Sequence, residues 1–580
     1  MPDSTIPFHT AAGETLSEGQ GAYLDGFFAG LKNRGYRFSD LAPIPDMPSA
    51  LPSEPDLIPE ERLKRELHPL DSYPLLLQHA AAHQAPDKEN TYRFKWHGLF
   101  YLSPTKEGFM ARLRIPGGAL RSFQLRELAT IADTLTSGYI QITTRSNLQM
   151  RLIQPKDAPE FLRRVQAIGL HTRGAGADNV RNLTCDATSG VDVEELIETL
   201  PLVEELAACI LHQREFYDLP RKFNIALHGG GSIPTLEETN DIGFRAVRVP
   251  AGPAEVPPGV YFRAAVGGAT GHKAFASDLG VLIPPDRLVA TACAMLRVYL
   301  QNGNRSDRKK ARLKHLLEHW SLHQFLEATE SQLGIKLPRV HGFEDQEENR
   351  RVPRPHPHVG IHPQKQAGLF WIGASVPVGQ LTSKQMRRVA ELAELYGSGE
   401  IRLTVWQSLI LPNIREAFIE TVARALKKIG FDTRQSNLRS GFVACTGNSY
   451  CKFAGANTKG HALELMDYLD RRVQLDVPVN VHLTGCPNSC AQHYIGDLGL
   501  LGAKVKVNGE SVEGYHIFVG GGFGSQTTVG RQLFQGVSVA MLPFTMEKIL
   551  QGFLAHRHPG ESFRGFTTRH DVRTLQELLG

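Results

Sequence analysis

Four cysteines in the C-terminal part of the chain are the residues best suited to do chemistry. Cys445 and Cys451 form a C-x5-C pair, and Cys486 and Cys490 form a C-x3-C pair after a gap of 34 residues. Four thiolates suit either a tetrahedral zinc ion or an iron–sulfur cluster. Structural zinc sites favour pairs two to four residues apart, so the wider first pair favours a cubane cluster, with zinc as the alternative.

Small and turn-forming residues flank these cysteines. Gly447 and Asn448 lie in the first pair, and Gly485 and Asn488 lie at the second. Such residues allow tight turns whose backbone N–H groups point at sulfur, and these hydrogen bonds tune a cluster's reduction potential. We therefore expect Asn448 and Asn488 to contribute to cofactor binding.

An internal repeat describes the elements that must position this site. Residues 115–173 and 376–434 align without a gap at a constant separation of 261 residues, with identical residues at Pro116/Pro377, Gly138/Gly399, Thr143/Thr404 and Arg173/Arg434. Each copy predicts strand, helix, strand, strand, helix. The apolar residues of 122–135 have helical spacing, which predicts a helix there.

A weaker repeat follows each copy. Residues 219–230 resemble 477–488, and residues 260–271 resemble the glycine-rich 513–524. The glycines of GGGFG lack dinucleotide spacing, so we interpret them as a tight backbone approach beside the cofactor. The chain is thus expected to be a pseudo-twofold, multidomain α+β protein, with a large cofactor at the interface between the halves.

The expected domains follow from these repeats and from composition. An N-terminal helical segment and extended arm would span 1–90, with a short helix in 17–35 and six prolines in 41–60 that predict an arm or a linker. The repeat units would span 91–173, 174–345, 366–434 and 435–580. The basic and polar stretch 344–365 marks the boundary between the halves.

Composition excludes several classes of protein. The 580 residues are 41% hydrophobic, and 64 Lys and Arg against 60 Asp and Glu give a net charge of +4, which does not indicate a nucleic-acid partner. The sequence has no apolar run long enough for a membrane span, and its first residues lack the pattern of a secretory signal. Seven cysteines do not make a disulfide scaffold, so we expect a cytoplasmic protein.

The segments CTGNSYC and TGCPNSC resemble those of the sirohaem and 4Fe–4S nitrite and sulfite reductases, and the resemblance extends from about residue 20 to about residue 560. It implies two ferredoxin-like half-domains and two α/β domains that bind sirohaem and the cluster. It also implies that Cys445, Cys451, Cys486 and Cys490 ligate a 4Fe–4S cluster, and that Cys490 bridges to the sirohaem iron.

The resemblance further implies a set of cations on the open face of the haem. FMARLRIPGG supplies Arg112, DNVRN supplies Arg181, and LPRKFN supplies Lys222 and Asn224 as catalytic residues. Sulfite reductases of the family carry Lys-x-Lys in the last motif and nitrite reductases carry Lys-x-Asn. The single cation favours the monoanion nitrite, with sulfite as the alternative.

Sirohaem carries eight carboxylates, which need cations and hydrogen-bond donors. The resemblance of TTRSNLQMR, residues 143–151, assigns Arg145, Gln149 and Arg151 to them, and Arg221 is a further candidate. Gln141 stands where some relatives have an arginine. Cys185 lies four residues after Arg181 and is interpreted either as a core thiol or as a neighbour of the haem.

No flavin or nicotinamide fingerprint occurs in the sequence, so electrons must come from another protein. The resemblance implies reduced ferredoxin, with flavodoxin as an alternative, and the basic stretches 305–310 and 350–351 are either docking residues or solvated faces. We expect a monomeric, assimilatory ferredoxin–nitrite reductase without a membrane partner. The rivals are a sulfite reductase, a precorrin-type oxygenase and a non-catalytic iron–sulfur or zinc protein.

Overall fold

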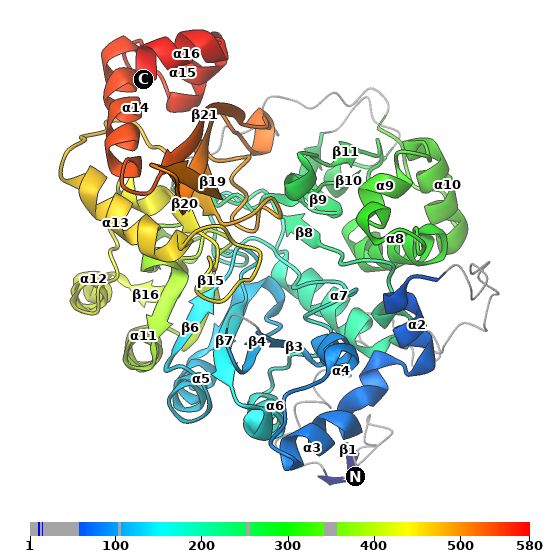
Figure 1. The fold of residues 1–580 in the computed structure, drawn as a ribbon. Coiled ribbons are helices and arrows are strands. Elements are labelled where there is room, and N and C mark those ends of the chain that lie inside the picture. Colours follow the sequence, from blue (N-terminus) through cyan, green and yellow to red (C-terminus); the bar gives the residue numbers. More distant parts are fainter. Residues whose placement is uncertain (1–9, 12–13, 16–56, 103–105, 251–255, 341–355) are drawn as a thin grey trace. The chain divides into compact units, whose positions relative to one another are not determined.

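The computed structural model describes residues 10–11, 14–15, 57–102, 106–250, 256–340 and 356–580. The chain divides into two units, residues 1–51 and 52–580. In the first unit, β1 (Thr10–Ala11) pairs antiparallel with β2 (Glu14–Thr15). The expected helix in 17–35 and most of the proline-rich segment lie outside the described residues. All other described elements belong to the second unit (Figure 1).

Three short helices open the second unit: α2 (Pro59–Glu66), α3 (Tyr73–Ala81) and α4 (Lys88–Arg93). Helix α2 is held by buried polar contacts, in which Lys64 Nζ donates to Leu219 O at 3.1 Å and Glu61 pairs with Arg305 at 2.7 Å. The sequence offered 305–310 as docking residues, but Arg305 is buried in this contact. Lys309 and Lys310 are the exposed cations of the stretch.

Each ferredoxin-like half-domain contains a five-stranded sheet that borrows one strand from the other. The first sheet has the order β14-β6-β7-β4-β3 and the second has the order β12-β13-β16-β15-β5. Their bounds are β3 Leu99–Tyr101, β4 Phe109–Arg112, β5 Ala119–Arg121, β6 Tyr139–Ile142, β7 Leu148–Ile153, β12 Gly360–Pro363, β13 Leu369–Ala374, β14 Gln380–Thr382, β15 Glu400–Leu403 and β16 Leu409–Arg415. Strands β5 and β14 are the exchanged ones.

The register of the exchanged strands obeys the 261-residue repeat. Leu120 pairs with Ile401 across β5 and β15, and Leu381 pairs with Ile140 across β14 and β6. A separation of 261 residues relates Ile140 to Ile401 and Leu120 to Leu381, so each residue of one pair has its counterpart in the other. The two exchanges are therefore related by the same internal twofold, which confirms the pseudo-symmetric α+β fold.

The helices of the two half-domains repeat in the same way. They are α5 (Ser122–Leu135), α6 (Ala158–Ala167), α11 (Ser383–Tyr396) and α12 (Ile419–Lys428). Helix α5 has the predicted bounds, and α11 begins with a capping box in which Thr382 and Gln385 bond each other's backbone N–H groups. The side-by-side helices α5 and α11 pack with both sheets around one shared hydrophobic core (Figure 1).

Each larger domain has its own sheet and core. The first contains β8 (Ile225–His228), β9 (Ile242–Val249), β10 (Gly259–Val266) and β11 (Ser277–Asp278), with α7 (Leu200–His212), α8 (Leu288–Asn302), α9 (Leu313–Leu316) and α10 (Leu322–Leu333). The second contains β17 (Phe442–Ala444), β18 (Val481–Thr484), β19 (Leu498–Val507), β20 (Glu510–Val519) and β21 (Arg531–Ser538), with α13 (Thr458–Asp470), α14 (Leu542–His556), α15 (Phe563–Arg569) and α16 (Val572–Leu579).

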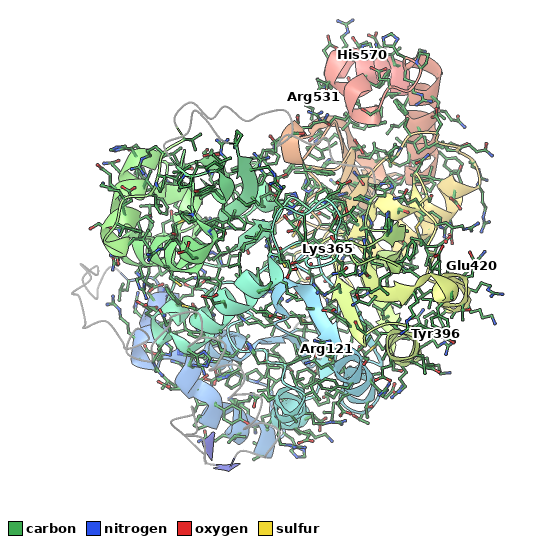
Figure 2. All side chains as sticks on the ribbon, turned by 180° about the vertical axis from the view of Figure 1, so that it is seen from behind. Arg121, Lys365, Tyr396, Glu420, Arg531 and His570 are labelled. Carbon is green, nitrogen blue, oxygen red and sulfur yellow. The ribbon has the colours of Figure 1, made fainter. Side chains whose placement is uncertain are left out.

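Contacts also join domains that are distant in sequence. Lys365, labelled in Figure 2, follows β12 and pairs with Glu195 and Glu198, both at 2.8 Å, in the first larger domain. Trp406, in the turn between β15 and β16, donates through Nε1 to Pro234 O at 3.0 Å and packs against Phe523. The second half-domain therefore contacts both larger domains.

The glycine-rich loop at 520–524 is explained by packing. A Cβ atom on Gly521 would lie 2.4 Å from Gly496 O, and one on Gly522 would lie 2.2 Å from Gln526 O. Only glycine allows the end of β20 to approach these neighbouring backbones so closely. The predicted tight approach is therefore present, and its neighbours are the protein's own turns.

Candidate functional site

The cysteines lie at one edge of the second larger sheet. Cys445 directly follows β17 and Cys486 follows β18, and these strands are parallel neighbours, so their carboxyl ends meet at the same edge. Gly485 N donates to Cys445 Sγ at 3.1 Å. Burial, and then the charges of Cys490, Cys451 and Cys445, raise the pKa of Cys486 to about 11. The four thiols therefore converge, although 46 residues of chain contain them.

The turns around the cysteines depend on their glycines. Gly447 has a φ of +71°, and a Cβ atom there would lie 2.7 Å from Thr458 N. Gly485 packs equally closely, since its Cβ would lie 2.6 Å from Ala454 Cβ. A larger residue at Gly447 would push the loop away from the start of α13, and one at Gly485 would push it away from Ala454.

The two asparagines that flank the cysteines make different contacts. Asn488 Nδ2 lies 3.5 Å from Cys486 Sγ and donates to it, and its role in cofactor binding stays a prediction. Asn448 Nδ2 instead donates to Glu513 Oε1 at 2.5 Å, and its backbone N–H donates to Ala456 O at 3.0 Å. In this structure Asn448 fixes the cysteine loop to β20 and to the start of α13.

Two residues that the sequence analysis missed begin α13 beside Cys445. Thr458 Oγ1 donates to Cys445 O at 2.8 Å and lies 3.5 Å from its Sγ atom. Lys459 Nζ donates to Ala444 O at 3.3 Å and also to Val378 O. Burial lowers the pKa of Lys459 to about 7, against the effect of the Cys445 charge. An Asn457 N-cap after the cysteine loop was the available signal.

The donors around the thiols indicate which metal group they fit. Gly485 N–H donates to Cys445 Sγ at 3.1 Å, and the Thr458 hydroxyl lies 3.5 Å from the same sulfur. N–H and hydroxyl donors at thiolate sulfurs are typical of iron–sulfur clusters, so the residues present fit the predicted cluster.

Three cations of the predicted site lie within electrostatic range of Cys490. Burial lowers the pKa values of three half-buried groups, Arg112, Arg145 and Lys222, and the Cys490 charge opposes each shift. Burial, and then repulsion by Arg312, lowers the pKa of Arg145 to about 10 and that of Lys222 to about 7. These predicted site residues come together although they are up to 378 positions apart in the sequence (112 to 490).

Arg181 and Asn224 are the other two residues predicted for the open face of the haem. Arg181 donates to Ala175 O and Ala177 O, both at 2.8 Å, and burial followed by the Arg112 charge lowers its pKa well below the usual value. Its Nε atom and Asn224 Oδ1 are buried and find no hydrogen-bond partner among the described residues. Crowded cations with unsatisfied polar atoms fit a polyanionic group with hydrogen-bonding substituents.

A row of polar side chains crosses the first half-domain sheet. Gln149 pairs with Arg112 on β4 and with Gln141 on β6. Gln141 Oε1 accepts from Arg151 Nε at 3.1 Å and from Nη2 at 2.9 Å, and Gln149 Oε1 accepts from the same Nη2 at 2.6 Å. Gln141, the departure from some relatives, thus holds Arg151 in place.

Arg151 and Arg221, two of the residues predicted to bind sirohaem carboxylates, already have partners within the protein. Arg151 is 2% exposed and also donates to Thr446 Oγ1 at 2.8 Å, beside Cys445. Arg221 lies 3.6 Å from the buried carboxylate of Asp178, which also binds Arg308. Their assignment to sirohaem carboxylates stays a prediction.

The first larger domain contains a counterpart of the cysteine site without cysteine. Ile225 pairs with Ile242 as Val481 pairs with Leu498, so Gly229 corresponds to Gly485. Gly229 N donates to Asp186 Oδ2 at 2.6 Å, as Gly485 N does to Cys445. Strand pairing, which the sequence does not show, sets this correspondence.

Asp186 therefore stands where the other half has Cys445. Thr199 Oγ1, at the start of α7, donates to Asp186 Oδ2 at 2.9 Å, in the place that Thr458 takes at Cys445. His228 Nδ1 lies 2.7 Å from Asp186 Oδ1. Although burial opposes it, Asp186 raises the pKa of His228 to about 9. An internal ion pair thus occupies the half that carries no thiol ligands.

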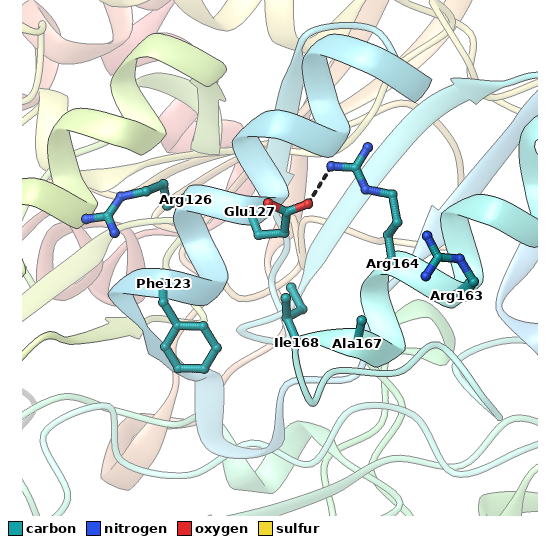
Figure 3. A pocket seen from close by; sticks show the side chains of 7 residues that line it. All are labelled: Phe123, Arg126, Glu127, Arg163, Arg164, Ala167 and Ile168. Carbon is teal, nitrogen blue, oxygen red and sulfur yellow. Dashed lines mark hydrogen bonds and ion pairs between the residues drawn. The ribbon is translucent and has the colours of Figure 1, made fainter. Parts of the chain in front are cut away.

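A shallow depression between α5 and α6 is unrelated to these residues (Figure 3). Its lining includes Phe123, Arg163 and Arg164, and none of its lining residues is a predicted site residue. Arg164 pairs with Glu127, and Arg163 pairs with Glu160 at 2.7 Å. The depression therefore presents no uncompensated charge for an anion.

Comparison with known proteins identifies the family. The model described as "Nitrite and sulphite reductase 4Fe-4S domain" matches residues 176–337 and 436–578. The model described as "Nitrite/Sulfite reductase ferredoxin-like half domain" matches residues 101–168 and 362–429. Together these matches cover more than half of the chain, and the chain belongs to the nitrite and sulphite reductase family of oxidoreductases. The family's cofactors, sirohaem and a 4Fe–4S cluster, are those predicted.

Individual relatives are similar over most of their length. The chain is 38% identical to ferredoxin–nitrite reductase of Synechococcus elongatus over 80% of this chain and 89% of the relative. It is 33% identical to the chloroplastic ferredoxin–nitrite reductase of Arabidopsis thaliana (85% and 83%) and 32% identical to "Sulfite reductase [ferredoxin] 2" of Mycolicibacterium paratuberculosis (83% and 89%). The structure of the Mycobacterium tuberculosis NirA protein matches with a TM-score of 0.83 at 30% identity, covering 90% and 97% of the two chains.

Within the described parts of the chain, every helix is too short or too polar to cross a membrane.

Proposed function

We propose that the chain is a ferredoxin-dependent nitrite reductase that reduces nitrite to ammonium with six electrons. The observation that carries the substrate choice is the pair Lys222 and Asn224. Asn224, two residues after Lys222, carries a neutral amide that is 3% exposed and whose Oδ1 finds no partner among the described residues. The cations of the proposed site, Arg112, Arg181 and Lys222, have pKa values that burial lowers. A site with one cation fewer than Lys-x-Lys is better matched to the monoanion nitrite than to the more highly charged sulfite. The similarity to ferredoxin–nitrite reductases supports this function.

The cluster and the sirohaem would be held by residues already placed. Cys445, Cys451, Cys486 and Cys490 would ligate the cluster, with Cys490 shared with the sirohaem iron. The donors for the carboxylates would be Arg145, Gln149, Arg151 and Arg221, with Asn448 and Asn488 at the cysteine loops. When bound, this coupled pair supplies the electrons and the metal site for the nitrite nitrogen.

The surrounding side chains would bind the anion and hold protons. Arg112 and Arg181 orient the nitrite oxygens by charge-assisted hydrogen bonds. Lys222, with a pKa of about 7, holds a proton on Nζ that is transferable near neutral pH to an oxygen that leaves as water. Asn224 limits the space and offers an amide to the uncharged edge of the substrate.

The proposal extends to the electron donor, the oligomeric state and the cellular compartment. Reduced ferredoxin is the proposed electron donor, because the relatives are named for it, and flavodoxin is the alternative. A monomer is proposed, because the two halves already satisfy each other through β5 and β14. The cytoplasm is proposed because all seven cysteines are free thiols, which is typical of a reducing compartment.

A product assay tests the substrate. Purified holoenzyme reduced with a viologen is given nitrite and sulfite separately, and ammonium and sulfide are measured. Rapid ammonium with little sulfide is the expected result. Dominant sulfide would contradict the nitrite assignment and leave the family unchanged.

Sulfite reduction is the second candidate. It is favoured by the 32% identity to the sulfite reductase of Mycolicibacterium paratuberculosis, of which the chain covers 89%. The same assay decides between the two substrates.

A further inference from the structure

Two cysteines outside the cluster site lie against each other in the first larger domain. Cys209 on α7 and Cys293 on α8 are 84 residues apart in the sequence, and their Sγ atoms are 3.2 Å apart. A disulfide bond is about 2.05 Å long, so the sulfurs need approach by only about 1 Å to form one. Cys185, the other cysteine outside the cluster, is buried without a second thiol beside it among the described residues.

The surroundings of the pair make the two thiols unequal. Cys209 is half-buried, whereas Cys293 is 4% exposed. Gln213 Nε2 donates to Cys209 Sγ at 3.2 Å, and Gln213 Oε1 in turn accepts from Arg297 at 2.8 Å. The hydrogen bond from Cys293 lowers the pKa of Cys209, against burial and with the help of Arg297. Cys209 is therefore the more accessible and the more nucleophilic thiol.

We propose that Cys209 and Cys293 are a reversible thiol–disulfide site that takes low-molecular-weight disulfides such as oxidised glutathione. The Cys209 thiolate attacks one sulfur of the oxidant, forming a mixed disulfide and releasing one glutathione thiolate. Cys293 loses its proton to solvent and attacks Cys209 Sγ, which releases the second glutathione. Two protein thiols are oxidised to one disulfide, and one glutathione disulfide is reduced to two thiols.

The disulfide would tie α7 to α8. Helix α7 begins at the contact between Thr199 and Asp186, so the link would brace the half that carries no thiol ligands. Because it closes a long loop of chain, the link should restrict the unfolded state and raise the unfolding temperature. This inference is independent of the substrate.

The experiment uses the holoenzyme equilibrated in a series of glutathione buffers of increasing reduction potential, from reducing to oxidising. Free thiols are alkylated, and the peptides are mapped by mass spectrometry. We expect Cys209 and Cys293 to lose alkylation together, to appear as one cross-linked peptide and to regain it with dithiothreitol, while Cys185 stays reduced. The unfolding midpoint should rise on oxidation by several degrees.

A matched pair of variants checks the order of attack. Cys293→Ser should accumulate the glutathione adduct on Cys209, whereas Cys209→Ser should leave Cys293 unmodified under the same conditions. Full alkylation of both residues in the wild-type protein at oxidising potentials, or a stable glutathione adduct on wild-type Cys209, would overturn the proposal. The wild-type measurement decides the question even if a variant fails to fold.

Discussion

Asn224 is the residue on which the proposed choice of substrate depends. Its side chain is 3% exposed, and its Oδ1 atom has no partner within the described parts of the chain. Its backbone N–H is fixed by Asp241 Oδ2 at 2.9 Å, so the side chain is presented from a rigid position. A charged side chain at position 224 would change the electrostatics near Lys222, while the backbone hydrogen bond to Asp241 would remain.

Asn224→Lys should therefore shift preference from nitrite toward sulfite. An added cation stabilises the more highly charged anion, and we expect the ratio of kcat/KM for sulfite to that for nitrite to rise about tenfold, equivalent to about 1.4 kcal/mol. Steady-state assays with both substrates measure this ratio. Asn224→Met is the control, because it removes the amide without adding charge; an equal shift in that variant would mean that charge is not the cause.

Lys459 offers a second residue-scale prediction. Its ammonium group lies against Ala444 O beside Cys445, and opposite charge at this short range stabilises the reduced cluster. Lys459→Met should lower the midpoint potential of the cluster by tens of millivolts. Spectroscopic redox titration measures it, with the exposed Lys452→Met as control. Equal potentials in the wild type and the Lys459 variant would remove Lys459 from the tuning of the cluster.

At the scale of elements, strand order gives each half a similar edge with different chemistry. Parallel β17 and β18 bring two cysteines to one edge, and the corresponding edge at β8 has Asp186 with His228. Both edges carry a glycine N–H and a threonine at the start of a helix. The shared backbone geometry accepts either thiolate ligands or a carboxylate bonded to imidazolium.

The ion pair at β8 predicts a pH dependence of stability. Because the pKa of His228 is raised to about 9 when folded, its stabilisation is complete below the unfolded pKa near 6.5 and is lost as pH rises through about 9. Asp186→Asn should destabilise this domain by about 3 kcal/mol at pH 7, because it removes the buried ion pair with His228 and with it the raised pKa of the imidazole. Hydrogen exchange of β8 and α7 amides measures both effects.

The comparison of the two proteins across pH provides the control. The difference in protection between wild type and Asp186→Asn should shrink above pH 9, where His228 is neutral in the folded protein. A difference that stays constant from pH 7 to pH 10 would show that the charge of His228 does not contribute.

At the scale of the whole second unit, the exchanged strands make the two halves interdependent. Strand β14 completes the sheet of the first half-domain, β5 completes that of the second, and α5 and α11 share one core. Each half alone would leave an unpaired strand edge and an exposed apolar helix face. The proposed site draws on both halves, because Arg112 and Lys222 come from one and Cys490 from the other.

Separated halves test this interdependence. Residues 1–345 and 346–580 expressed alone should each lack a cooperative unfolding transition and aggregate, whereas co-expression should give a one-to-one complex. Size-exclusion chromatography and circular dichroism report the outcome. A stable, cooperatively unfolding single half would contradict the view that the shared core is essential.

The sequence alone determined the features that depend on local spacing. The helical period in 122–135 and the constant separation of 261 residues predicted helices and strands that the structure contains, since both patterns arise within short segments. The cysteine spacing predicted a cluster rather than zinc, because ligand geometry limits the spacing of pairs. The resemblance of the motifs predicted the family, which the comparisons confirm.

Only the tertiary structure decided which distant residues meet. The strand exchange, the bond of Gln141 to Arg151, the burial of Arg305 and the correspondence of Asp186 with Cys445 all involve segments that no local period connects. The approach of Cys209 to Cys293 is another example. Such contacts depend on how whole sheets and helices pack, and packing selects partners by shape and burial summed over many residues rather than by the type of any one of them.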